Sequence, residues 1–154
     1  MTNREKSIAF FLEKGVSHQI IEHSKEVFIC TDTAVERNVL LSQVVKTLIF
    51  YDKKKQIHVF MVPGDQSLNQ RKARHAMKSN KMKFVDKAVL EQEFGLIIGA
   101  ISPILMIGKA RLFMDAKLAV QEVLTISTGN PGSGIKLSRE DLVRVLKCEI
   151  VDIT

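Results

Sequence analysis

The sequence is poor in cysteine and has no long apolar run. Its two cysteines, Cys30 and Cys148, lie far apart, without a CxxC pair or any Cys/His spacing typical of metal ligands. We therefore predict no metal site, no disulfide scaffold and two reduced thiols in the core. No segment reaches the about 18 apolar residues of a membrane helix. Residues 1–15 mix charged and apolar residues, unlike a signal peptide, so we expect a cytoplasmic protein.

Several motifs of well-known enzyme classes are also missing. The chain has no GxGxxG, no GxxxxGK[ST], no HExxH and no GxSxG, which removes the usual signals for dinucleotide, nucleotide, zinc-protease and serine-hydrolase sites. The histidines are scattered along the chain, and we interpret each as a structural or surface residue rather than a ligand. They are His18, His23, His58 and His75.

The composition is that of one globular domain. The 154 residues are 45% apolar and 26% charged, which excludes collagen-like and disordered classes, and a chain of this size can bury a substantial core. We see no linker or repeat and predict a single domain over residues 1–154. The sequence does not indicate an oligomeric state.

The formal net charge of +6 favours a polyanionic partner. The basic residues concentrate in residues 69–84, where no acidic residue occurs. This segment is either a solvated helix face or a phosphate-binding surface, and it lacks the aromatic residues of a base-stacking platform. The residues concerned are Arg71, Lys72, Arg74, Lys78, Lys81 and Lys83.

Apolar periodicity and turn residues predict an α+β fold with a mixed, mostly antiparallel sheet and peripheral helices. The segments DKKK and GNPGSG are expected to form turns, Thr31 or Thr33 to cap the second helix, and Ser138 with Asp141 to begin the last one. The expected helices are 4–14, a second ending near 41, 68–79, a fourth from Asp86 to Phe94, and 139–146. The expected strands are 18–23, 44–51, 56–62, 96–101, 104–107, 111–114, 123–127, 135–137 and 149–153.

Two segments contain residues that a plain core strand would not use. Lys46 interrupts the apolar run VVKTLIFY; it either faces water through strand alternation or projects into a cleft as a charge for an oxyanion. FGLIIGAISPIL, residues 94–105, contains Gly99, Ala100, Ser102 and Pro103. Its small residues either form a β-bulge at a sheet corner or let a ligand approach the backbone.

Six segments, in order along nearly the whole chain, resemble the YbaK and prolyl-tRNA-synthetase-associated domain family. They are IEH (21–23), TAVERN (33–38), VVKTLIF (44–50), VPGD (62–65), FGLIIGAISPIL (94–105) and ISTGNPGSGIKLSREDLVRV (126–145). The resemblance implies a curved, barrel-like sheet and an aminoacyl-tRNA deacylase. Such an enzyme removes a small amino acid, alanine, cysteine or similar, from mischarged tRNA, tRNA(Pro) in particular, acting in trans beside a synthetase. It implies no cofactor.

The resemblance also implies roles for individual residues. Lys46 would bind a phosphate or ester oxygen, and Gly99 would offer its amide to the developing oxyanion. The expected substrate-binding residues are Thr47, Ala100, Ile101, Ser102, Pro103, Ser127 and Gly129, and the expected RNA-binding residues are Arg71, Lys72, Arg74, Lys78 and Lys81. The competing hypothesis is a non-catalytic module that binds a tRNA end or a small ligand beside a synthetase.

Four positions depart from the family pattern. Phe94, Ala100, Pro131 and Gly134 stand where a threonine, a glycine, an arginine and, in some cysteine-specific members, an acidic residue are usual. They leave the amino acid and the tRNA undetermined.

Overall fold

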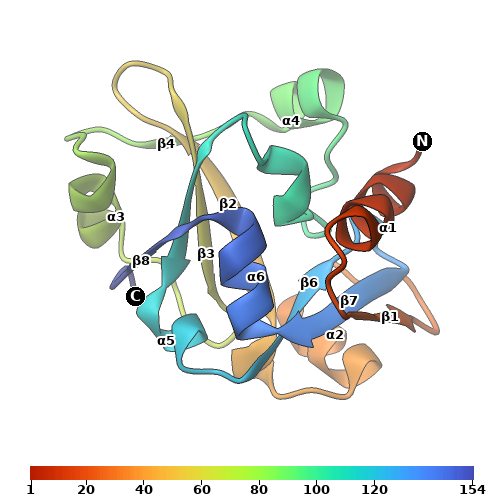
Figure 1. Ribbon diagram of the computed structural model, residues 1–154. Helices are drawn as coiled ribbons and strands as arrows, with labels where there is room; N and C mark the ends of the chain where they lie inside the picture. The colour runs from red at the N-terminus through yellow and green to blue at the C-terminus, as the bar shows by residue number, and fades with distance from the viewer.

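The computed structural model describes all 154 residues as an α+β fold built on two sheets (Figure 1). One sheet has the strand order β4-β2-β3-β5-β8 and the other the order β1-β7-β6. The strands are β1 (Gln19–Glu22), β2 (Val45–Tyr51), β3 (Ile57–Pro63), β4 (Lys83–Phe84), β5 (Arg111–Asp115), β6 (Val123–Ser127), β7 (Ser133–Ser138) and β8 (Glu149–Val151). The helices are α1 (Asn3–Glu13), α2 (Cys30–Arg37), α3 (Gln70–Met77), α4 (Lys87–Phe94), α5 (Ala116–Ala119) and α6 (Arg139–Leu146), with short 3₁₀ turns η1 (Leu41–Gln43) and η2 (Pro103–Met106).

The predicted mixed, mostly antiparallel sheet is confirmed, but the sheets do not close into a barrel. β2 pairs antiparallel with β3 and β4, and β7 pairs antiparallel with β1 and β6, whereas β5 pairs parallel with β3 and β8. Only one isolated bridge, between Val44 and Thr125, joins the two sheets. None of the helices has the length and apolar character needed to span a bilayer.

The predicted strands 96–101 and 104–107 are wrong. Residues 95–102 form an irregular loop, and Pro103 begins η2. Gly99 has φ +87°, a left-handed conformation outside the β region. Leu96 and Ile101 are nevertheless buried, whereas Ile97 and Ile98 are 40% and 48% exposed. The apolar run therefore predicted burial correctly at only some of its residues, and it does not form a strand. Without these strands no further pairing is available to close the sheet.

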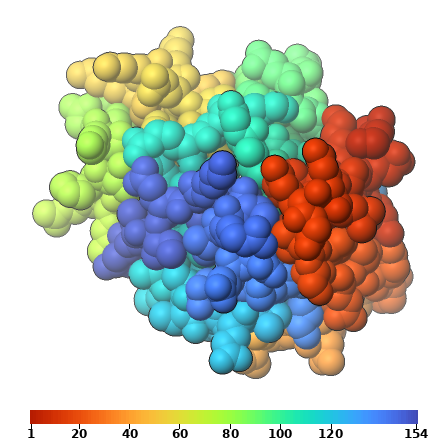
Figure 2. Space-filling view, in the orientation of Figure 1, coloured from red at the N-terminus to blue at the C-terminus, as the bar shows by residue number.

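Strand alternation in the hairpin β2–β3 divides the core into two clusters. Ile49 and Met61 belong to a cluster of 22 buried residues that also takes side chains from the three-stranded sheet and from α6. Phe50 and Phe60 point to the opposite face, where α3 covers a cluster of seven. In Figure 2 the C-terminal segment that carries α6 lies beside the N-terminal segment on one face of the molecule.

Helix starts agree with the sequence where a cap side chain is present. Ser138 accepts a hydrogen bond from the Asp141 amide at 3.1 Å, as predicted. Asp86 precedes α4 but makes no side-chain cap bond. The second helix begins at Cys30 after Ile29, so neither Thr31 nor Thr33 is its cap; the Thr33 hydroxyl donates instead to the Ile29 carbonyl at 3.1 Å.

The turn between β2 and β3 is stabilised by a buried pair of polar residues. One Asp52 oxygen accepts from the amides of Lys54 and Gln56 at 2.8 and 2.9 Å, and the other accepts from His58 Nε2 at 2.8 Å. His58 is only 1% exposed. Burial would raise the pKa of Asp52, but the hydrogen bonds from His58 and the two amides outweigh it and lower that pKa.

We expect Asp52→Asn to lower the free energy of unfolding by about 2 kcal/mol at neutral pH, because it removes a charged partner from a buried histidine. The stabilisation by a carboxyl of lowered pKa is complete above its ordinary value of 3.8 and disappears as the pH falls through the folded-state value. Urea unfolding across this pH range would measure it. Asp86→Asn, at an exposed acid without a cap bond, is the matched control; equal stability of the two variants at neutral pH would contradict the prediction.

Candidate functional site

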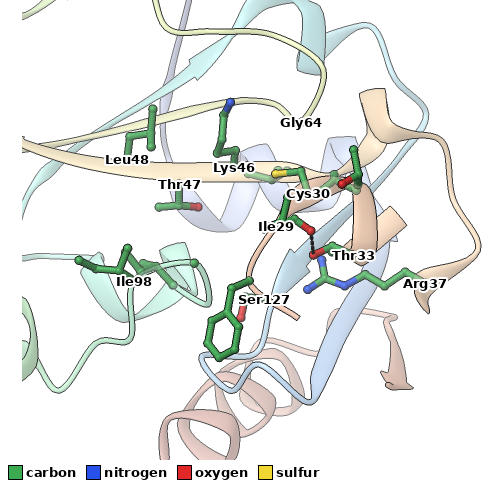
Figure 3. Close-up of a pocket in the computed structure, with 16 residues that line it drawn as sticks. Ile29, Cys30, Thr33, Arg37, Lys46, Thr47, Leu48, Gly64, Ile98 and Ser127 are labelled. Atoms are coloured by element: carbon green, nitrogen blue, oxygen red, sulfur yellow. Dashed lines mark hydrogen bonds between the residues drawn. The ribbon is translucent and has the colours of Figure 1, made fainter. Parts of the chain in front are cut away.

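A cavity of about 420 Å³ lies between α2, the start of β2 and the loop 95–102 (Figure 3). No aspartate or glutamate lines it. Its walls are Phe28, Ile29, Cys30, Thr31, Thr33 and Arg37 from α2 and the segment before it; Val44, Val45, Lys46, Thr47 and Leu48 from β2 and the residue before it; Ile98, Gly99 and Ile101 from the loop; and Gly64 and Ser127. The cavity therefore carries positive charge, from two basic side chains, without an acid to balance it.

Lys46 is half-buried in this wall. Its ammonium donates to the Gln66 carbonyl at 2.8 Å and makes no ion pair. In Figure 3 the side chains of Lys46 and Thr47 leave opposite sides of β2, as strand alternation requires. Of the two alternatives for Lys46, its position in the cavity lining fits the second, in which it borders a cleft. Its charge is available to a ligand because no carboxylate neutralises it, and its role in binding stays a prediction.

The two hydroxyls predicted at the site also line the cavity. The Thr47 hydroxyl oxygen is buried and has no hydrogen-bond partner. Ser127 accepts from the Gly129 amide at 2.9 Å, so its own proton remains free to donate. A buried hydroxyl without a partner is unfavourable, and a polar ligand group would satisfy the one on Thr47.

The loop 95–102 presents backbone amides that the protein does not use. The amide of Ala100 donates to the Ile97 carbonyl at 2.9 Å, whereas those of Ile98, Gly99 and Ile101 donate no hydrogen bond. Gly99 packs against Phe28: a Cβ there would lie 2.9 Å from the Phe28 carbonyl oxygen. The loop thus combines free donors with a close approach that only glycine permits.

Four predicted site residues pack behind the cavity instead of lining it. Ala100 is 2% exposed and Pro103 begins η2. The Ser102 hydroxyl accepts from Ser7 at 3.0 Å, and because Ser102 is fully buried and does not line the cavity, it cannot reach a substrate there. Gly129 lies against α1, where a Cβ would be 2.6 Å from the Asn3 Cβ. These four residues therefore support the residues that line the cavity and do not face it themselves.

Arg37 is a cavity residue that the sequence did not indicate. It is 7% exposed and lines the wall beside Ser127 and Thr33 (Figure 3). Burial lowers its pKa to about 10, with a small opposing contribution from Cys30, so it stays protonated at neutral pH. A basic residue in the last turn of a helix is explained by its favourable interaction with the helix dipole. The sequence position of Arg37 therefore did not indicate that it lines a cavity.

The cysteines are half-buried rather than core residues. Cys30 borders the cavity, where burial raises its pKa even though Lys46 and Arg37 oppose the shift. Burial raises the pKa of Cys148 to about 11. Both thiols are therefore neutral at pH 7, and Cys30 is not an activated nucleophile. No three His, Cys, Asp or Glu side chains are grouped as metal ligands.

The basic segment forms a surface separate from the cavity. Arg71, Lys72, Arg74 and Lys78 line one shallow hollow on α3, where Lys72 pairs with Asp152 at 2.9 Å. Lys81 borders a neighbouring hollow that shares Arg74 with the first. The five predicted RNA-binding residues therefore lie on adjoining surfaces, and none of them lines the cavity.

Comparisons with known proteins agree on one family. The model described as "Aminoacyl-tRNA editing domain" matches residues 24–145. The "Putative Cys-tRNA(Pro)/Cys-tRNA(Cys) deacylase EbsC" of Enterococcus faecalis is 26% identical over 73% of this chain and 68% of its own. A "Proline--tRNA ligase" of Streptococcus thermophilus is 28% identical over 79% of this chain, which corresponds to only 19% of the ligase.

Solved structures show the same fold at low sequence identity. One is entitled "Crystal structure of a putative trans-editing enzyme for prolyl tRNA synthetase"; it covers all of this chain and 98% of its own, with a TM-score of 0.89 and 16% identity. A crystallised hypothetical protein covers 96% of this chain and 98% of its own, with a TM-score of 0.88 and 19% identity.

Proposed function

The chain belongs to the aminoacyl-tRNA editing domain family, and from this premise we propose that it hydrolyses the ester between a small amino acid and the terminal adenosine of a mischarged tRNA. Alanine, cysteine or a similar amino acid on tRNA(Pro), removed in trans, is the proposed substrate. The names of the Enterococcus faecalis relative and of the solved trans-editing protein support this, as does the likeness to part of a proline–tRNA ligase.

The observation that carries the proposal is one cavity lined by a cation, an unpaired hydroxyl and loop residues with free backbone amides. Lys46 supplies the charge, Thr47 the hydroxyl, and the loop residues Ile98, Gly99 and Ile101 the amides. A cavity of about 420 Å³ is within the usual range for small-molecule sites. It suits an aminoacyl group with part of the terminal nucleoside.

The chemistry needs no protein nucleophile, because an aminoacyl ester is already activated. Water attacks the carbonyl once the ester is held in place, and the bond between the acyl carbon and the ribose oxygen then breaks. The proton lost by the water goes to that ribose oxygen, which leaves as a hydroxyl of the terminal adenosine while the amino acid is released. The free loop amides donate to the carbonyl oxygen as it becomes negative, and preorganised donors of this kind stabilise the transition state more than the ground state. Lys46 binds a phosphate or ester oxygen on one side of β2, and Thr47 and Ser127 offer their hydroxyl protons to polar groups of the substrate elsewhere in the cavity.

Release of the amino acid from alanyl-, cysteinyl- and seryl-tRNA(Pro) tests the proposal directly. Correctly charged prolyl-tRNA(Pro) is the control, and all are compared with the rate without protein. We expect hydrolysis of at least one mischarged species well above the rate for the prolyl control. Tight binding of the charged tRNA without any release would identify a non-catalytic module instead.

We further propose that the basic surface on α3 binds the tRNA backbone, because Arg71, Arg74 and Lys78 make no ion pair there and only Lys72 is paired, with Asp152. For single strands, the logarithm of the binding constant falls with the logarithm of the salt concentration, with a slope of about 0.7 per phosphate contact. With about three such contacts, affinity should fall roughly twentyfold from 50 to 200 mM salt. Neutralising exposed Lys78 and Lys81 to glutamine should reduce that fall to about threefold. The matched control neutralises Lys6 and Lys14, exposed on and beside α1; equal slopes for the two double variants would remove α3 from the interface.

A further inference from the structure

Arg37 is held by hydrogen bonds to side chains from two separate segments. Its Nε donates to His23 Nε2 at 3.2 Å, and its Nη1 donates to the Thr125 hydroxyl oxygen at 3.2 Å. His23 Nδ1 in turn contacts the Pro131 carbonyl at 2.8 Å, so Nδ1 carries the proton and Nε2 is free to accept. The guanidinium is therefore preorganised before any ligand arrives.

Glycine at position 134 is what makes room for this arrangement. A Cβ on Gly134 would lie 2.3 Å from Arg37 Nε and 2.6 Å from its Cζ. The guanidinium thus rests on bare backbone of β7, and any side chain at 134 would displace it. The position of the Arg37 guanidinium in the cavity wall therefore depends on the absence of a side chain at residue 134.

The charge of Arg37 is not neutralised within the protein. No carboxylate pairs with it, its Nη2 donates no hydrogen bond, and the other basic residue in the cavity, Lys46, has no acid partner either. A buried cation without a counter-ion is costly. A ligand oxyanion in the cavity would complement it, most effectively a carboxylate, which accepts from a guanidinium edge through two parallel bonds.

Burial indicates which part of the substrate supplies that oxyanion. Arg37 is 7% exposed, with Thr125 and His23 packed around it. A nucleotide phosphate could reach Arg37 only if its attached ribose also entered this buried part of the cavity. A short amino-acid side chain could reach Arg37 without any further part of the substrate. Lys46, which is more exposed and bonds the Gln66 carbonyl, suits a phosphate better.

We propose that Arg37 is a specificity-determining residue that binds the side-chain carboxylate of a small acidic aminoacyl group, so that an aspartyl ester is preferred over an alanyl ester. This rests on the proposed deacylase function, but it replaces alanine or cysteine by aspartate as the amino acid that the same cavity prefers. The carboxylate accepts from the free Nη2 edge of Arg37 while the ester carbonyl meets the loop amides.

The test uses tRNA(Pro) charged chemically with aspartate, asparagine or alanine. Asparagine keeps the size of aspartate and removes its charge. With the wild-type protein we expect kcat/KM for the aspartyl ester to exceed that for the alanyl ester by about tenfold or more, with the asparaginyl ester between them, since a hydrogen bond to a charged group has a larger effect than one to a neutral group.

Substitution of Arg37 then tests its role. Arg37→Gln should bring the aspartyl-to-alanyl ratio close to one, and Arg37→Lys should restore part of it because the charge is kept without the planar fork. Arg144→Gln is the matched control: Arg144 is an exposed arginine on α6 paired with Asp141, and its loss should leave the ratio unchanged. Thermal melting of each variant accompanies the kinetics.

A binding measurement on the wild-type protein decides the matter even where Arg37→Gln fails to fold. Calorimetry with non-hydrolysable aspartyl- and alanyl-amide analogues of the terminal adenosine should show tighter binding of the aspartyl analogue. The inference would be overturned if the two analogues bound equally, or if Arg37→Gln lowered kcat/KM by the same factor for all three esters. Either result would mean that Arg37 binds a group that all the substrates share. Preferential binding of the aspartyl analogue without hydrolysis of any ester would support it while refuting the deacylase.

Discussion

Replacing Gly99 by valine is expected to reduce deacylation by about 100- to 1,000-fold, the effect of losing an oxyanion donor in other enzymes. Gly99 has φ +87°, and a Cβ would lie 2.9 Å from the Phe28 carbonyl oxygen and 3.1 Å from the Phe28 Cβ. The loop must therefore shift, and with it the free amides of Gly99 and its neighbours. Because Phe28 also lines the cavity, the same shift changes the wall that faces the substrate.

Single-turnover deacylation and thermal melting, measured on the same preparation, distinguish this role from a structural one. Gly108→Val is the matched control: Gly108 also has a positive φ, +79°, but a Cβ there meets nothing within 4 Å, and it does not line the cavity. It should show the stability cost of backbone strain without the catalytic loss. A Gly99 variant that melts far earlier yet hydrolyses normally while folded would show that the loop only supports the fold.

Replacing Lys46 by alanine is expected to lower deacylation about tenfold to a hundredfold while leaving the fold intact, because a charged hydrogen bond contributes about 1.5 to 3 kcal/mol. The only protein partner of the ammonium is the Gln66 carbonyl, at 2.8 Å. That contact is a single bond at the cavity edge, so its removal should change the melting temperature little. The loss should appear in the chemical step or in tRNA binding.

Lys117 provides a close control for Lys46. Its ammonium also contacts Gln66, through the side-chain Oε1 at 3.1 Å, but it is exposed and does not line the cavity. Lys117→Ala should therefore keep wild-type turnover. If Lys46→Ala also keeps it, with a normal melting temperature, the lysine in β2 only tethers the Gln66 segment.

Local sequence patterns were sufficient to predict those elements whose structure is determined by residues close together in the chain. Alternation and the DKKK turn predicted the hairpin of β2 and β3, and Ser138 with Asp141 predicted the start of α6. For Lys46 the sequence left two alternatives open, because a lone charge in an apolar strand must either face water or meet a polar partner. The order of motifs along the chain was sufficient to indicate the family, which the match over residues 24–145 confirms.

Tertiary structure alone decided the details of the cavity. An apolar run such as 94–105 is equally compatible with a buried strand and a buried loop, because burial depends on what packs against it and not on its own hydrogen-bond pattern. The Ser102 hydroxyl faces Ser7, 95 positions away, and so lies behind the wall. Arg37 lies at the cavity because Thr125, 88 positions away, accepts a hydrogen bond from it and Gly134 leaves room for its guanidinium. Contacts at such separations leave no local periodicity, so only the folded chain shows which polar groups the cavity brings together.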